Sequence, residues 1–221
     1  MKKIVVTILL LLAGLISFAA EGKKQDTVKE EKKIELTAEQ KAVLQKREDY
    51  FKKNYSDKNG IKKSIKLEND TYNLVWSGYH DSGTASFEFL RKGETMDKYN
   101  RLISVISLSP YININLYMKS YLASVKQYMI NQPTAVKNKK SKFKDDILMD
   151  FILADEKEDV MEYTQMRACI NEKNEGIVYV LSIKFKLSEM KKDKEKFKKE
   201  IDDKAVNWAE DMFKIDFVPF N

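Results

Sequence analysis

The chain contains very little cysteine, histidine, proline or glycine: its 221 residues include one Cys, one His, three Pro and seven Gly. A lone cysteine excludes an intramolecular disulfide, so the folded part must be held together by its core. One histidine and one cysteine cannot form a structural zinc cluster, and no catalytic or cofactor motif is present. We therefore expect neither a metal nor a cofactor. The scarcity of proline and glycine favours long regular helices and strands.

The single cysteine, Cys169, lies in an apolar segment, Met161 to Ile170, that is typical of a strand. A thiol in such a segment behaves as a small hydrophobic side chain, because free cysteine is among the most buried residue types. We therefore expect Cys169 to belong to the core. The alternatives are a reactive free thiol or an intermolecular bridge.

The N-terminal sequence is typical of a secretory signal peptide at residues 1–20. Lys2 and Lys3 are followed by the apolar stretch Ile4–Phe18 and then by Ala19 and Ala20. The apolar stretch is short for a membrane span, and a basic start with a small-residue exit favours cleavage after residue 19 or 20. The region has no cysteine that could be lipidated, so we expect no stable membrane anchor after cleavage. The protein is then exported, to the periplasm or as a secreted protein.

The overall composition favours a globular domain: 33% of the residues are charged and 43% are hydrophobic. The formal charge is +6, and loss of Lys2 and Lys3 with the leader would lower it to +4. This small excess is spread among many acids, which argues against nucleic acid as a partner. We predict a charged flexible tether at residues 21–36, an N-terminal helix at 37–60 and an α+β domain at 61–221.

Three helices and six strands are predicted from local patterns. Thr37 and Gln40 have the spacing of a capping box, which begins the first helix. Apolar residues at helical spacing predict a second helix from Asn113 to about Ile130 and a third from Glu189 to about Phe213. Period-two alternation predicts strands at 72–80, 84–91, 102–108, 147–153, 160–170 and 177–187.

Consecutive strands without intervening helices form antiparallel sheets, so the fold class is α+β. We predict an antiparallel sheet of about six strands covered by two amphipathic helices, with an extra N-terminal helix. Trp76 and Trp208 each appear on the apolar face of their element in this pattern. Both are therefore predicted to be substantially buried.

This order of elements resembles that of the PsbP/Mog1-like α/β sandwich proteins, which include small proteins of the bacterial periplasm. The resemblance covers about residues 65–217. Besides element order it rests on three short features of the sequence: Phe87-Glu88-Phe89, the following Gly93-Glu94, and a terminal helix that carries Trp208. The resemblance implies a scaffold or accessory role and no enzyme class.

One candidate ligand site lies on the predicted second helix, where Tyr117, Tyr121 and Tyr128 share a face with methionines. Tyrosine pairs an apolar ring with a polar hydroxyl, so such a face either lines a pocket or forms plain core. The lone histidine, His80, is a further candidate. Its neighbour Asp81 would point to the opposite face of a strand, so the two do not converge locally.

The basic segment Lys137–Lys144 either binds an anionic surface or forms a solvated loop. Together these features favour a non-enzymatic binding or interaction module of the cell envelope, with a protein or a small apolar ligand as its partner. The alternatives are a periplasmic hydrolase with an unassigned site and a protective partner of a secreted toxin.

Overall fold

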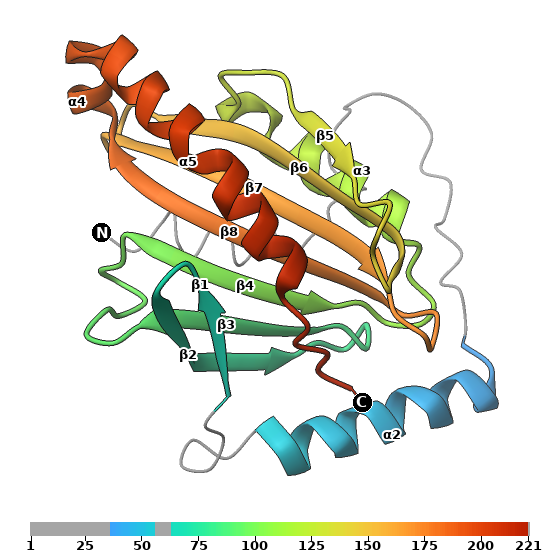
Figure 1. Cartoon of the computed structure of the whole chain (residues 1–221). Helices are drawn as coiled ribbons and strands as arrows, with labels where there is room; N and C mark the ends of the chain where they lie inside the picture. Colours follow the sequence, from blue (N-terminus) through green and yellow to red (C-terminus); the bar gives the residue numbers. More distant parts are fainter. Residues whose placement is uncertain (1–35, 56–62, 221) are drawn as a thin grey trace, which may run out of the picture.

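In the part of the chain that the structure describes, eight strands lie side by side in one antiparallel sheet, in the order β1-β2-β3-β4-β8-β7-β6-β5 (Figure 1). The computed structural model describes residues 36–55 and 63–220. The strands are β1 (Ser64–Leu67), β2 (Asp70–Tyr79), β3 (Ala85–Arg91), β4 (Arg101–Ser107), β5 (Thr134–Lys137), β6 (Lys144–Asp155), β7 (Val160–Ile170) and β8 (Gly176–Lys186). The predicted α+β class is confirmed. The predicted count of about six strands is wrong, because the sheet has eight.

The two unpredicted strands, β1 and β5, are the short edges of the sheet. Each has four residues and pairs with one neighbour only. All four residues of β5 are exposed, so this strand has no alternation of apolar and polar positions that would reveal it. In the sequence it merges with the basic segment that follows. Short, charged edge strands are a common way to prevent edge-to-edge aggregation.

The helices are α2 (Ala38–Tyr55), α3 (Ile114–Val125), α4 (Leu187–Lys192) and α5 (Lys194–Lys214), and the 3-10 turn η2 (Lys126–Tyr128) follows α3. The capping box before α2 is confirmed by reciprocal hydrogen bonds between Thr37 and Gln40. The predicted continuous C-terminal helix is interrupted at Asp193. The Asp193 carboxylate accepts a hydrogen bond from the Lys196 amide and begins α5, as expected of aspartate at an N-cap.

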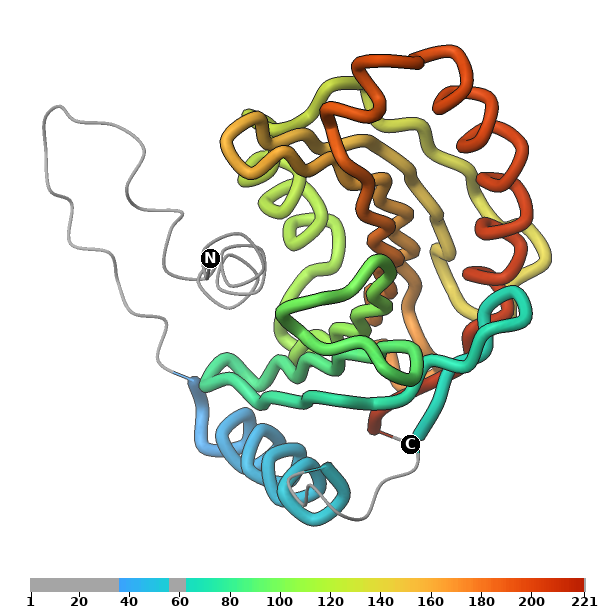
Figure 2. The backbone as a smooth tube through the Cα atoms, turned by 90° about the vertical axis from the view of Figure 1, so that its left-hand side faces the viewer, coloured from blue at the N-terminus to red at the C-terminus, as the bar shows by residue number. Residues whose placement is uncertain are grey.

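Two apolar layers hold helices on opposite faces of the sheet (Figure 2). One face of β3, β4 and β8 packs against α5, the C-terminal segment and α2, with Phe87, Tyr179 and Trp208 all buried. The other face packs against α3, with Met166 and Phe151 in contact with its tyrosines and aliphatic side chains. Cys169 is buried in β7, as predicted, and burial raises the pKa of its thiol to about 12.

Two buried arginines fix the helices to the sheet. Arg47 of α2 forms an ion pair with Glu175 and donates a hydrogen bond to the Leu108 carbonyl at 3.2 Å. Arg167 of β7 forms two hydrogen bonds with Asp146, at 2.8 and 2.9 Å, and donates two more to carbonyls at the end of α5. A buried ion pair of this kind leaves a costly unpaired charge when one partner is removed.

A β-bulge in β2 reverses the predicted orientation of Trp76. The register shifts between Leu74 and Trp76, so Leu74 lies opposite Phe89, whereas Trp76 lies opposite Glu88. An extra residue in one strand moves every later side chain to the other face. Trp76 is therefore 39% exposed, and the prediction that it is buried is wrong, while Trp208 is 1% exposed as predicted.

This difference in exposure can be measured by fluorescence. We expect Trp76→Phe to shift the native emission to the blue, because the remaining Trp208 is buried. Trp208→Phe should shift the emission to the red, since the half-exposed Trp76 then dominates. Native emission spectra of the two variants, each compared with its urea-unfolded form, test this. A red shift on removal of Trp76 would contradict the bulge in β2.

Several predictions fall on residues outside the described part of the chain: the leader at 1–20, nearly all of the tether and the end of the helix predicted at 37–60. Within residues 36–55 and 63–220, no helix combines the length and the apolar character needed to cross a membrane.

Candidate functional site

The structure places the predicted site residues in different surroundings. Tyr117 and Tyr121 lie on the side of α3 that faces the sheet, and both are buried. Tyr128 lies in η2 and packs at the margin of the apolar layer beneath α3. His80 follows the end of β2, where its Nε2 atom lies 3.3 Å from the Ser86 hydroxyl. Only Tyr117 and Tyr121 therefore converge on one region.

That region is a band of polar side chains on the face of the sheet that carries α3. We call it the polar cluster and define it as Glu88, Tyr99, Ser104, Tyr117, Tyr121, Glu162, Thr164, Ser182 and Lys184. The register brings its strand residues together, because Glu88 lies opposite Ser104 and Glu162 lies opposite Lys184. The connection between β3 and β4 supplies Tyr99, and α3 supplies the other two tyrosines.

Glu88 lies at one end of the polar cluster and is 1% exposed. Ser104 donates a hydrogen bond to its Oε2 atom at 2.6 Å. Burial raises the pKa of the Glu88 carboxyl to about 8, against a smaller opposing effect of the Ser104 hydrogen bond. Desolvation disfavours the charged form of an acid, so this carboxyl holds its proton at neutral pH.

Glu162 and Lys184 form the other end of the cluster. Burial raises the pKa of Glu162, and hydrogen bonds from Ser182 and Thr164 oppose the shift. Burial also lowers the pKa of Lys184, while the charge of Glu162 opposes that change. The Lys184 ammonium lies 3.7 Å from the centre of the Tyr99 ring, which is a cation–π contact. This acid therefore has a basic partner inside the fold.

The three tyrosines connect the two ends. Burial and the nearby charges of Glu162 and Glu88 raise the pKa of Tyr99. Burial raises the pKa of Tyr117 as well, and the charge of Glu88 adds to that shift. The Tyr117 hydroxyl is buried and has no hydrogen-bond partner among the described residues. A buried polar group without a partner costs about 1–3 kcal/mol, so it marks a position where a further polar group fits.

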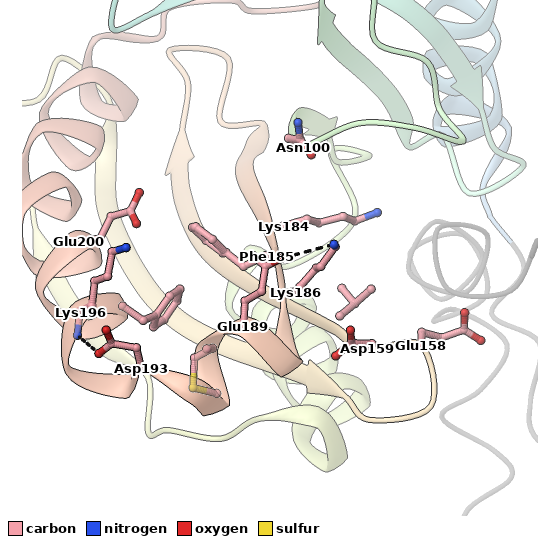
Figure 3. A pocket seen from close by; sticks show the side chains of 13 residues that line it. Asn100, Glu158, Asp159, Lys184, Phe185, Lys186, Glu189, Asp193, Lys196 and Glu200 are labelled. Carbon is pink, nitrogen blue, oxygen red and sulfur yellow. Dashed lines mark hydrogen bonds and ion pairs between the residues drawn. The ribbon is translucent and has the colours of Figure 1, made fainter.

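An open pocket of about 660 Å³ lies where β8 passes into α4 (Figure 3). Phe185 and Phe197 stack edge-to-face in its apolar part, with ring centres 5.0 Å apart. Most of the charged side chains around it have a partner within the protein. Lys186, for example, forms an ion pair with Glu189. Lys184 and Phe185 point in opposite directions from β8, and Lys184 both lines this pocket and contacts Tyr99 of the polar cluster.

The described residues contain no group of three or more His, Cys, Asp or Glu side chains placed to hold a metal ion. The arrangement of the polar cluster suits hydrogen bonding and charge recognition. Sequence reasoning found Tyr117 and Tyr121 but missed Glu88, Glu162, Tyr99 and Lys184. The only signal for Glu88 was a charge between two phenylalanines in a predicted strand, which is also the pattern of a solvent-facing position.

The described residues thus define an α+β protein with one antiparallel sheet and a buried polar cluster under α3. A protein-family model matches residues 59–217, well over half of the chain, and the chain belongs to this family. The match begins after α2 and takes in all eight strands, α3, α4 and α5. No curated protein and no solved structure matches the chain.

Proposed function

We propose that this protein is an exported, non-enzymatic binding module of the cell envelope, and that its ligand contacts the polar cluster. The observation that carries the proposal is the convergence of two buried acids and three tyrosines on one face of the sheet. Strongly perturbed groups of this kind gather at functional sites. The N-terminal sequence pattern, with its basic start and apolar stretch, supports the exported location.

The resemblance to PsbP/Mog1-like proteins belongs to the same proposal. It is supported by the order of elements, in which each set of four strands is followed by a helix, and by the position of Trp208 on α5.

A hydrolase is the second candidate, because His80 and Ser86 resemble a base and a nucleophile, with Nε2 and Oγ 3.3 Å apart. A catalytic histidine also needs a group that orients its second ring nitrogen. No described carboxylate hydrogen-bonds to His80, and Ser86 is buried. These features favour the binding module.

A ligand screen tests the proposal. The mature protein is incubated with a panel of amines, organic acids, sugars and fatty acids, and its melting temperature is recorded. We expect compounds that stabilise the wild type to stabilise Tyr117→Phe less, because this variant removes only the unpartnered hydroxyl. The stabilising compound should also be recovered chemically unchanged. Equal stabilisation of both proteins, or conversion of the compound, would contradict a binding module centred on the polar cluster.

His80 gives an additional test of the two candidates. We expect His80→Ala to change ligand affinity less than threefold, since His80 contacts Ser86 at the end of β2 and lies outside the polar cluster. If the protein has a turnover activity, a hundredfold loss with an unchanged melting temperature would mean that His80 supplies about 2.7 kcal/mol of transition-state stabilisation. That result would favour the hydrolase.

A further inference from the structure

Four acids are buried in the described part of the chain: Glu88, Asp146, Glu162 and Glu175. Three of them have a basic partner inside the fold, because Arg167 binds Asp146, Arg47 binds Glu175 and Lys184 lies beside Glu162. Within the same residues, Glu88 has only the Ser104 hydroxyl. Buried carboxylates are normally paired, so Glu88 is the acid for which the described part of the fold supplies no cation.

The surroundings of Glu88 have the features of a cation site. The unpartnered Tyr117 hydroxyl is buried beneath α3 on the same face of the sheet as Glu88 and can accept a hydrogen bond from a donor group. The indole of Trp76 lies on the same face, directly over Gly78, where a Cβ atom on the glycine would come within 2.5 Å of the ring. Trp76 is 39% exposed and lies opposite Glu88, so this side is the one nearest to solvent. Aromatic faces attract ammonium groups.

We propose that the polar cluster binds the ammonium group of a small primary amine, with Glu88 as its counter-ion and the Tyr117 hydroxyl as a hydrogen-bond acceptor. This inference rests on the proposed binding function and names its ligand class. In this proposal the ligand's ammonium group is the cationic partner of Glu88, just as the Lys184 ammonium is the cationic partner of Glu162. Trp76 lies opposite Glu88 in the strand register, and the Tyr99 ring contacts Lys184, the neighbour of Glu162, so both ends of the cluster have an aromatic side chain.

Binding of a cation requires the ionised form of Glu88, so amine binding and proton release are coupled. With a pKa of about 8, Glu88 is mostly protonated at pH 7, and its affinity for amines should rise about tenfold from pH 6 to pH 7. The affinity should level off near pH 9 and fall again above about pH 10, where the amine itself loses its proton. Among the described residues, the other titratable groups whose pKa values depend on the charge of Glu88 are Tyr99 and Tyr117, and both values are raised. Neither of these changes charge between pH 7 and pH 9.

The test is an NMR titration of the mature protein with propylamine and with 1-propanol, which has a hydroxyl in place of the ammonium. We expect propylamine to shift amide signals around Glu88 and Tyr117, and we expect 1-propanol to have no effect. Glu88→Gln keeps the size and the hydrogen-bonding capacity of the side chain, so it should weaken propylamine binding at least tenfold and abolish the pH dependence. Tyr117→Phe should weaken binding severalfold.

The matched control is Glu158→Gln, which removes an exposed carboxylate that lines the pocket of Figure 3. It should leave the propylamine affinity unchanged. Unaltered binding by Glu88→Gln, equal binding of 1-propanol, or no binding of propylamine would each overturn the amine inference. The binding function would still stand if the ligand screen found another compound that depends on Tyr117, and it would fail separately if the screen found none.

Discussion

Arg167→Met should destabilise the protein by about 3–5 kcal/mol, which is the usual cost of removing one partner of a buried ion pair. The Arg167 and Asp146 side chains are 1% and 0% exposed. The substitution leaves the Asp146 carboxylate buried without its cation. It also leaves the carbonyls of Met212 and Ile215 without the hydrogen bonds, both 2.8 Å, by which Arg167 holds the end of α5. Urea denaturation followed by circular dichroism measures the loss.

Two further variants isolate the cause of this loss. Arg167→Met combined with Asp146→Leu removes both charges, so it should recover part of the lost stability. Lys198→Ala, on the exposed side of α5, should change the free energy of unfolding by less than about 0.5 kcal/mol. A loss below about 1 kcal/mol for Arg167→Met would show that the ion pair does not hold α5 to the sheet.

Glu88→Gln should change how stability depends on pH. The pKa of Glu88 is raised from 4.5 to about 8 in the folded protein. The folded state therefore binds a proton that the unfolded state releases between these two values. Folding stability then falls as pH rises through this window and levels off above it. Between pH 5 and pH 9 the wild type should lose roughly 4 kcal/mol relative to Glu88→Gln, which cannot ionise.

The comparison uses urea denaturation of both proteins at matched pH values. A difference in the free energy of unfolding that is the same at every pH reports only on packing. The quantity of interest is therefore how this difference, the offset, changes with pH. The matched variant Glu158→Gln alters an exposed acid and should follow the wild type throughout. An offset between wild type and Glu88→Gln that stays constant from pH 5 to pH 9 would show that Glu88 ionises as it does in the unfolded chain.

Much of the architecture could be predicted where one local pattern decides the outcome. The buried face of α3 follows from apolar residues at spacings of three and four, and its start follows from Asn113, whose side chain accepts two backbone hydrogen bonds. The long strands β7 and β8 follow from their apolar, β-branched composition. Both strands are confirmed within one residue of the predicted bounds.

The remaining features depend on contacts that no local pattern contains. Strand β5 is exposed on both sides, so its pairing with β6 leaves no trace in its own sequence. The bulge in β2 inserts one residue into an otherwise regular alternation and reverses Trp76. The polar cluster could not be predicted from local patterns either, because Glu88 and Glu162 lie on different strands. Only the sheet order β3-β4-β8-β7 and the placement of Tyr99 and α3 bring them to one site.

The most direct test of the account is the protonation state of Glu88, measured by the chemical shift of its ¹³C-labelled carboxyl group as a function of pH. Assignment comes from the signal that Glu88→Gln removes. The account predicts a midpoint near pH 8 in the ligand-free protein and an ionised carboxyl at pH 7 when propylamine is bound. A midpoint near the ordinary value of 4.5, or a signal that propylamine does not change, would contradict it.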